Sequence, residues 1–223
     1  MALSSEDKLL VTKTVASRNV HSSMLTVFIR EVMEEAGVKM AELDAVAVSK
    51  GPGSFTGLRI GVSVAKGIAW GLELPLISVS SLEALAGKAS NNAGQDDILC
   101  PLIDARNNEF YFAVFSSKLR ELLPADAGLI SQEIFSPLEG YNKILFFGDG
   151  IEKIEDSILK IKKAEILKGI GADAASLSVL AYLKYVAGEF ENIKTFEPFY
   201  LRDFKARNLG KKIGRILYPE NEK

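Results

Sequence analysis

Apolar and polar positions follow two different patterns along this chain. Short apolar runs bounded by Gly, Pro, Asn or Asp predict buried strands, and longer segments with apolar residues three and four positions apart predict helices. The predicted strands lie at 8–16, 44–49, 76–79, 98–104, 109–115 and 143–147. The predicted helices lie at 21–36, 56–72, 80–89, 151–160 and 173–189. Strands and helices that follow one another in this way are typical of α/β architecture.

Two of the predicted helices carry more apolar surface than one core contact requires. The apolar stripe of helix 21–36 consists of Leu25, Phe28, Ile29, Val32 and Ala36, and it is widened by Met24, Val27 and Met33. Helix 56–72 carries a strip of small residues every four positions, Gly57, Gly61, Ala65 and Ala69, beside a second strip of Ile60, Val64 and Ile68. Large apolar patches that stay exposed usually mark an interface, so we expect both helices to bind a partner.

Composition indicates a folded protein of one large domain or two lobes. Apolar residues make up 48% of the 223 residues and the net charge is −2, which favours a sizeable core and gives no global polyanion-binding signal. The polar segment 91–97 predicts a linker, so we expect a first lobe at 1–95 and a second at 96–223. A single cysteine, Cys100, and an N-terminus without a signal-peptide pattern predict a cytoplasmic protein that is not inserted in a membrane.

A glycine-rich turn at 51–57 connects a predicted strand to a predicted helix. Such a turn can hold an anion, because backbone N–H groups and a helix N-terminus point to one place. The turn lacks the Lys of a Walker A loop, and its spacing differs from the dinucleotide fingerprint. It is therefore either a structural strand-to-helix turn or an anion site. The candidate anion residues are Gly51, Gly53, Ser54, Thr56, Gly57 and Arg59.

Other candidate chemistry is sparse. The chain has one histidine and one cysteine, and it lacks paired ligands at zinc spacing, so no metal site is expected. His21 opens a predicted helix, where capping or packing is the simplest role. Asp104 and Asp149 follow predicted strands, the position where α/β proteins gather functional groups. The segment 202–215 carries six basic residues and one acidic residue; it is either a solvated tail or an RNA or partner contact.

The run GPGSFTGLRIGVSVAKGIAWGLELPLISVSSLEALA, at 51–86, resembles the signature of the TsaB family, also called YeaZ. Weaker matches are the His-Ser pair at 21–22, IDARNNEFYFAVF at 103–115, GDG at 148–150 and EPFYLR at 197–202. The resemblance covers about residues 3–202. It implies a two-lobed actin-like, sugar-kinase-like ATPase fold with mixed sheets flanked by helices.

The resemblance also implies a function without catalysis. The family supports the synthesis of threonylcarbamoyladenosine at position 37 of tRNA, and the catalytic subunit is its relative TsaD. The metal motif of TsaD, His-Met-Glu-Gly-His, falls on residues 81–85 of this chain, where Ser81 and Leu85 replace the two histidines. Because leucine cannot ligate a metal, the chain is expected to keep the scaffold and to lack the catalytic ligands.

The implied partners follow from the first two helices. The family binds TsaD through them, together with TsaE in a larger complex, and forms a homodimer when alone. The expected interface residues are Leu25, Phe28, Ile29, Val32, Ile60, Gly61, Val64 and Ile68. No cofactor is expected beyond weak ATP or ADP association at the partner interface, and a contact between the basic tail and tRNA stays open.

One departure from the family concerns the N-terminus. Family members begin with a strand resembling ILAIDTST, and this sequence starts inside the strand that follows, near Ala2 and Leu3. We therefore expect a misassigned start codon. Two alternative functions stay open: a nucleotide-dependent phosphotransferase using Asp104 or Asp149 with the glycine turn, and a metallopeptidase, against which the missing histidine pair argues.

Overall fold

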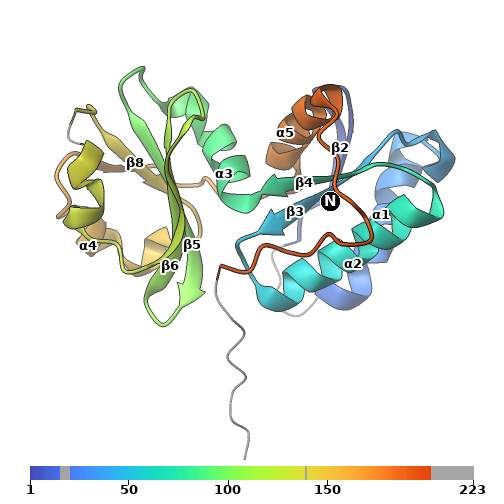
Figure 1. Ribbon diagram of the computed structural model, residues 1–223, viewed down its shortest axis with the longest axis horizontal. Coiled ribbons are helices and arrows are strands. Elements are labelled where there is room, and N and C mark those ends of the chain that lie inside the picture. The colour runs from blue at the N-terminus through green and yellow to red at the C-terminus, as the bar shows by residue number, and fades with distance from the viewer. Residues whose placement is uncertain (16–20, 139, 202–223) are drawn as a thin grey trace, which may run out of the picture.

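The chain folds into two lobes that lie side by side (Figure 1). The computed structural model describes residues 1–15, 21–138 and 140–201. One lobe is built on a five-stranded sheet, and the other on two pairs of strands with three long helices around them. No helix within these described ranges is long and apolar enough to cross a membrane.

The second lobe contains a mixed sheet in the order β7-β6-β5-β8-β9. Its strands are β5 (Ile98–Arg106), β6 (Glu109–Ser116), β7 (Glu121–Gly128), β8 (Ile144–Phe147) and β9 (Ala164–Ile166). β5 pairs antiparallel with β6 and parallel with β8, so it stands in the centre. Its first five residues are all buried, as expected of a strand covered on both faces.

Two apolar clusters cover the two faces of this sheet. One contains Ile98, Leu102, Phe110 and Phe146 under the short helices η3 (Gln132–Leu138), η4 (Ile151–Lys153) and α4 (Glu155–Ile158). The other places Leu99, Leu145 and Phe147 against α3 (Ser81–Ala89). Alternate residues of β5 therefore serve opposite clusters, the period-2 pattern of a strand.

The first lobe has less sheet. Within the described residues, β1 (Ala2–Ser5) pairs antiparallel with β2 (Lys8–Thr12), and β3 (Val46–Gly51) pairs parallel with β4 (Leu76–Ser80). The two pairs form separate two-stranded sheets. The short helices η1 (Met40–Glu42) and η2 (Ser90–Asn92) lie in connections.

Three helices hold the first lobe together. α5 (Ala174–Ala187) contacts all four strands, α1 (His21–Ala36) contacts β1 and β2, and α2 (Phe55–Gly71) contacts β3, β4 and α1. In Figure 1, α5 lies on one side of β3 and β4 and α2 on the other side. The packing is therefore three-layered, with thin strands between helices.

Chain order and packing differ at the C-terminal end. Residues 96–223 were expected to form the second lobe, and this division stays a prediction. Within it, α5 follows the second-lobe strands in sequence but packs against β1–β4 of the first lobe. Phe196 likewise joins the apolar cluster of α2 and β4. The described chain after β9 thus returns to the first lobe.

Most predicted elements are confirmed. Helix 21–36 has the expected bounds, and Ser80 caps α3 by accepting a hydrogen bond from the Glu83 N–H at 3.4 Å. Strands β7 and β9 were not predicted, and the single helix expected at 151–160 is divided into two short helices, η4 and α4. The side chain of His21 and the basic segment 202–215 lie outside the described part of the structure.

Candidate partner-binding site

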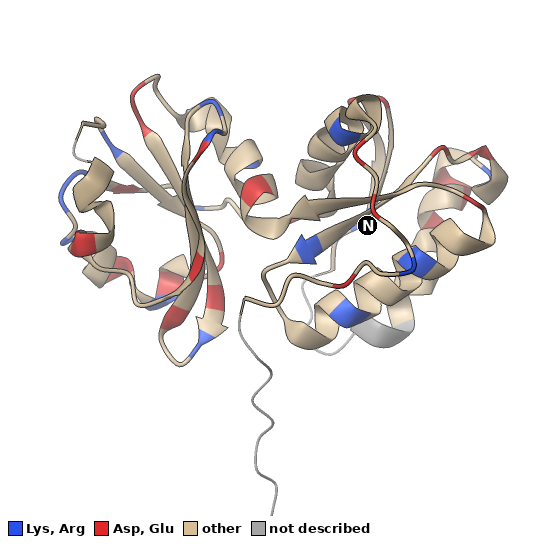
Figure 2. Cartoon of the chain, in the orientation of Figure 1, with Lys and Arg blue, Asp and Glu red and all other residues tan. Residues whose placement is uncertain are grey.

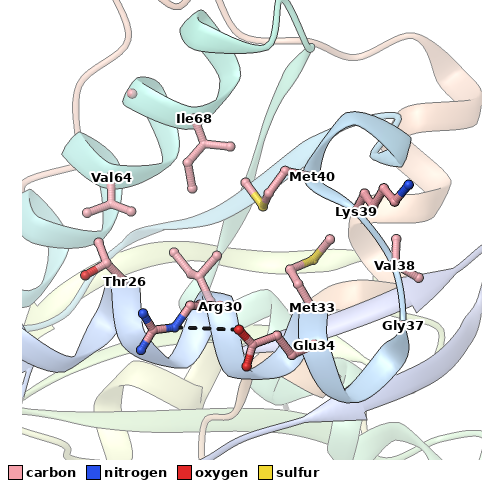
Figure 3. A pocket seen from close by; sticks show the side chains of 12 residues that line it. Thr26, Arg30, Met33, Glu34, Gly37, Val38, Lys39, Met40, Val64 and Ile68 are labelled. Atoms are coloured by element: carbon pink, nitrogen blue, oxygen red, sulfur yellow. Dashed lines mark ion pairs between the residues drawn. The ribbon is translucent and has the colours of Figure 1, made fainter.

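An apolar groove lies between α1 and α2, and its volume is about 770 Å³ (Figure 3). The chain reaches it three times: through α1, through the connection that follows α1, and through the middle of α2. The apolar side chains lining it are Ile29, Met33, Val38, Met40, Val64 and Ile68. Gly67 adds an open stretch of helix backbone. The geometry suits the apolar face of a partner helix.

Polar groups are confined to the rim of the groove. Arg30 and Glu34 lie four residues apart on α1, with Nε 3.8 Å from Oε1, and both side chains are about 70% exposed. Such a pair is screened by water and contributes little to stability. It can instead set the orientation of a charged partner.

Three of the predicted interface residues meet in this groove. Ile29 enters it from α1, and Val64 and Ile68 enter it from α2. Figure 3 shows Val64 and Ile68 directed from their helix toward the α1 side. Ile60, one turn earlier on α2, is half-buried and does not line the groove.

Leu25 and Phe28 belong to a different surface. They line a smaller cavity of about 240 Å³ together with Met1, Lys13 and the start of α5 at 172–174. Both side chains are half-buried. The stripe predicted on α1 is therefore divided between the groove and this cavity.

Two predicted interface residues point inward. Val32 is 1% exposed, so its side chain is part of the core. A Cβ atom on Gly61 would lie 3.8 Å from Val48 Cγ2, which shows that this side of α2 faces β3. The small residues of α2 thus let the helix approach its own sheet, because Ala65 and Ala69 are buried there as well. The burial of Val32 excludes a direct contact between its side chain and a partner, whereas Gly61 is half-buried and stays a prediction.

Val38 and Met40 were missed by the sequence reasoning. They follow Gly37, whose φ of +67° ends α1 and turns the chain back beside α2. Glycine adopts this left-handed conformation without steric cost. The sequence signal was the apolar pair just after a helix-ending glycine.

The glycine turn is closely packed and serves α2. Ser54 is the N-cap, and its Oγ accepts the Gly57 N–H at 3.4 Å. Gly51 has a φ of +106°, and a Cβ atom there would lie 2.9 Å from both Leu58 Cδ1 and the Phe199 carbonyl oxygen. These contacts explain the glycine and the cap residue without an anion. Gly53 and Thr56 have no such packing role, so an anion at the turn stays a prediction.

Arg59, the cation expected at that turn, lies beside it and contacts Phe55 and Tyr200. Its guanidinium lies 4.1 Å from the centre of the Phe55 ring, and its Nε donates to the Tyr200 hydroxyl at 3.0 Å. The two rings are 5.0 Å apart. An anion would have to compete with this cation–π arrangement.

Comparisons with known proteins bear on this groove and turn. Residues 11–208 match the family model described as "TsaD: tRNA N6-adenosine threonylcarbamoyltransferase". A "tRNA threonylcarbamoyladenosine biosynthesis protein TsaB" from Haemophilus influenzae is 30% identical, and the match covers 84% of this chain and 82% of that protein. The chain belongs to the TsaB family. A TsaB from Bacillus subtilis is also 30% identical, over 66% of this chain and 65% of the relative.

Solved structures agree with this family at the level of the fold. "YeaZ from Pseudomonas aeruginosa" superimposes with a TM-score of 0.72 and 27% identity, covering 90% of this chain and 92% of that one. A second structure from the same organism, described as similar to "peptidase YEAZ", has a TM-score of 0.67 and 26% identity, with coverage of 82% and 85%. The expected actin-like, two-lobed α/β architecture is confirmed.

Ser81 and Leu85, which were expected to replace the two metal-binding histidines of TsaD, have structural roles in this TsaB-family chain. The Ser81 hydroxyl lies 2.6 Å from the Ser49 hydroxyl, and Leu85 is fully buried under the second-lobe sheet. Across the described ranges, no group of three His, Cys, Asp or Glu side chains could hold a metal ion. The arrangement fits packing of α3 rather than ligation.

Asp104 and Asp149 are brought together at the carboxyl ends of β5 and β8. The Asp149 Oδ1 accepts the Asp104 N–H at 3.1 Å, and Asp104 forms an ion pair with Lys153. Figure 2 shows further acidic positions at this edge of the lobe. Loss of hydration alone would raise the pKa of Asp104, but Lys153 and the Arg106 N–H outweigh it and hold that pKa below its ordinary value.

The Asp149 carboxyl is shifted the other way. Loss of hydration raises its pKa, the nearby Asp104 charge adds to the effect, and the hydrogen bond from the Asp104 N–H only partly offsets it. The pair therefore joins the end of β5 to the turn after β8, and its hydrogen bonds are satisfied within the lobe.

Proposed function

We propose that this chain acts in the biosynthesis of tRNA threonylcarbamoyladenosine as a non-catalytic subunit that binds TsaD through the groove between α1 and α2. Membership of the TsaB family supports the pathway, since relatives carry that name. The groove supports the mode of action, because its lining is apolar and its polar groups lie at the rim. The groove is the observation that carries the proposal.

The proposal assigns no catalytic residue and no resident cofactor to this chain. Ser81 and Leu85, the positions that the sequence resemblance assigns to the two histidines of TsaD, are engaged in hydrogen bonding and packing. Arg59 is stacked on Phe55 and hydrogen-bonded to Tyr200, so its arrangement beside the glycine turn is explained without a bound anion. Binding energy, rather than chemistry, is then the contribution of this subunit.

Further partners belong to the same proposal. Without TsaD, the groove would pair two copies of the chain, because an apolar helix surface can meet its own copy about a two-fold axis. TsaE would join the TsaD complex. A contact between tRNA and the basic segment 202–215 would add an affinity that falls with salt concentration.

The groove is tested by placing a charge in its centre. Val64→Asp puts a carboxylate among apolar side chains that would contact the partner, so we expect the dissociation constant for TsaD to rise at least about tenfold. The matched control is Val179→Asp on α5, which is 46% exposed and outside the groove. Calorimetric titration with TsaD measures both variants, with circular dichroism to verify folding.

Activity of the reconstituted system gives the second readout. TsaD, TsaE and this chain are assayed for adenosine modification of tRNA, and omission of this chain or use of Val64→Asp should abolish stimulation. The proposal fails if folded Val64→Asp binds TsaD as tightly as the control variant does. Turnover of ATP by the isolated chain with Mg²⁺ would instead support the phosphotransferase alternative.

A further inference from the structure

The segment 191–200 follows α2 along its length on the side away from the groove, in the opposite chain direction. It begins where α2 ends and finishes where α2 begins (Figure 1). The EPFYLR stretch lies at its end, and the docking function leaves that stretch without a role. We call residues 191–200 the strap.

The start of the strap is fixed to β4 and to the end of α2. The Glu191 N–H donates to the Leu76 carbonyl oxygen at 2.8 Å, and the Glu191 carboxylate accepts a hydrogen bond from the Ser78 hydroxyl. Lys194 Nζ lies 5.8 Å from the centre of the Trp70 ring. This end of the strap is thus tied to sheet and helix together.

The middle of the strap is a buried anchor. Phe196 is 8% exposed and packs in the cluster that contains Val62, Ala65 and Ala69 of α2. Its carbonyl oxygen accepts a hydrogen bond from Lys66 Nζ at 2.9 Å. The aromatic ring therefore fills the side of α2 that the small residues leave open.

The end of the strap lies on the glycine turn. The Phe199 N–H donates to the Lys50 carbonyl oxygen at 2.7 Å, and Tyr200 packs on Phe55 while its hydroxyl accepts from Arg59 Nε. The first turns of α2 are therefore held by residues that come much later in the chain. Arg59 and Tyr200, for example, are separated by 141 positions.

We propose that the strap positions α2 and thereby sets the shape of the groove for TsaD, so that its aromatic residues control docking without touching the partner. The inference rests on the proposed function. None of the strap residues lines the groove, whereas Val64, Gly67 and Ile68 of the same helix do. α2 rests on a sheet of two strands, so the strap supplies a large part of its remaining support.

The physical basis is linkage between the two sides of one helix. Helices at interfaces shift by an ångström or two as units, and such a shift would change the separation of α1 and α2 that the partner has to match. If a partner binds only one position of α2, its apparent affinity falls in proportion to the fraction of molecules in which α2 has that position. Loosening the strap should therefore weaken docking by a factor typical of coupled sites.

The experiment compares strap variants of the full chain in TsaD titrations. Phe196→Ala removes the buried anchor and should weaken binding by about tenfold, and Tyr200→Ala should weaken it by about threefold to fivefold. Phe196→Leu keeps most of the buried apolar volume and Tyr200→Phe keeps the aromatic ring. Both should therefore bind TsaD more tightly than the corresponding alanine variants do. The control is Phe190→Ala, an exposed aromatic that contacts Tyr185 of α5 and should leave binding unchanged.

Hydrogen exchange on the free chain separates positioning from general unfolding. In Phe196→Ala, exchange should accelerate by a larger factor at the amides of α2 than at those of α3 and β5, whose rates rise only as far as the lower free energy of unfolding requires. The inference is overturned if wild type binds TsaD and Val64→Asp does not, yet both alanine variants bind like wild type. It is also overturned if exchange in α2 rises by no more than it does in α3 and β5. If wild type fails to bind at all, the proposed function fails, and exchange in α2 still decides whether the strap holds the helix.

Discussion

The two lobes solve the problem of burying apolar surface in different ways. The five strands of the second lobe are covered on both faces, and the fully buried Phe110, Phe146 and Phe147 all lie there. In the first lobe, β4 contributes the fully buried Leu76 and Ile77, but the helices keep much of their apolar surface half-buried or exposed. The second lobe therefore contributes most of the fully buried aromatic core, whereas the first lobe leaves apolar helix surface available for contact with a partner.

α5 illustrates the contrast within one element. It is apolar on most sides, yet Ala181 is its buried residue, and Val179, Leu183 and Val186 are between 46% and 67% exposed. By comparison, the nine residues of α3 include five that are buried: Leu82, Ala84, Leu85, Ala86 and Ala89. α3 is buried more completely because it packs against the five-stranded sheet on one side and against α5 and β4 on the other, whereas one side of α5 stays exposed.

The largest predicted effects on the free energy of unfolding come from truncating two phenylalanines, one from each lobe. Phe146→Ala removes a fully buried ring that packs edge-on against Phe135 with centroids 5.4 Å apart, and it should lower the free energy of unfolding by about 3–5 kcal/mol. Phe196→Ala, at the less enclosed first-lobe cluster, should cost roughly 2–3 kcal/mol. Urea denaturation measures both. A cost for Phe196→Ala equal to or above that for Phe146→Ala would contradict the contrast between the lobes.

Two glycines at strand ends extend the comparison to the backbone. Gly148, with a φ of +114°, follows β8, and a Cβ atom there would lie 2.1 Å from the Leu102 carbonyl oxygen, whereas Gly51 meets a leucine side chain and the strap at 2.9 Å. Gly148→Ala should therefore cost about 2–4 kcal/mol, and Gly51→Ala less, because the added Cβ overlaps its neighbours less closely, at 2.9 Å against 2.1 Å. Thermal denaturation of both variants and of the unstrained control Gly53→Ala checks this order; equal losses for the two would refute it.

A substitution at the junction between the lobes should change stability by a smaller amount, and this change should depend on pH. Asp173 caps α5 by accepting the Ser176 N–H at 2.7 Å, and it pairs with Lys88 of α3 at 2.5 Å. Partial burial alone would raise the pKa of Asp173, but Lys88 and Ser176 outweigh it and lower that pKa. Asp173→Ala should cost about 1–2 kcal/mol at pH 7.

The sign of the pH dependence follows from the lowered pKa. A carboxyl whose folded pKa lies below its unfolded pKa stabilises the fold above the unfolded value, near 3.9, and loses this contribution as pH falls through the folded pKa. The difference between wild type and Asp173→Ala should therefore shrink below about pH 4. Asp173→Asn keeps a cap acceptor and should cost less than alanine does; a difference that grows in acid would exclude the assigned role.

The sequence predicted local features better than contacts between distant segments. The bounds of α1 follow from its 3.6-residue period and from Gly37, and the cap at Ser80 follows from its position before an apolar helix. β7 was missed because it contains Pro124 and lacks a clean alternation, and β9 because it has three residues. Both strands lie at the edges of the sheet, where their partners define them more than their own residues do.

The groove was predictable only in part, for a related reason. Periodicity identifies which residues of α1 and α2 are apolar, but Val32 and Gly61 face inward because of where β3 and the core lie, which no local pattern specifies. The sequence indicated only the EPFYLR match, which overlaps the strap at 197–200, and the place of the strap along α2 depends on contacts such as that between Arg59 and Tyr200. Resemblance to the TsaB family supplied the function that the residue patterns alone left open.

The smallest predicted change in stability is for Gly67→Ala in α2, which should affect stability and partner binding in opposite directions. Gly67 lies inside α2 and lines the groove, and a Cβ atom there would meet nothing within 4 Å in the isolated chain. Gly67→Ala should therefore raise the free energy of unfolding by about 0.5–1 kcal/mol through helix propensity, while the added methyl group occupies space that the partner needs and weakens TsaD binding. Gly71→Ala, in the same helix and outside the groove, is the matched control. If Gly67→Ala binds TsaD as Gly71→Ala does, the first lobe offers a different surface to its partner, because an added methyl group in a closely packed interface is expected to weaken binding.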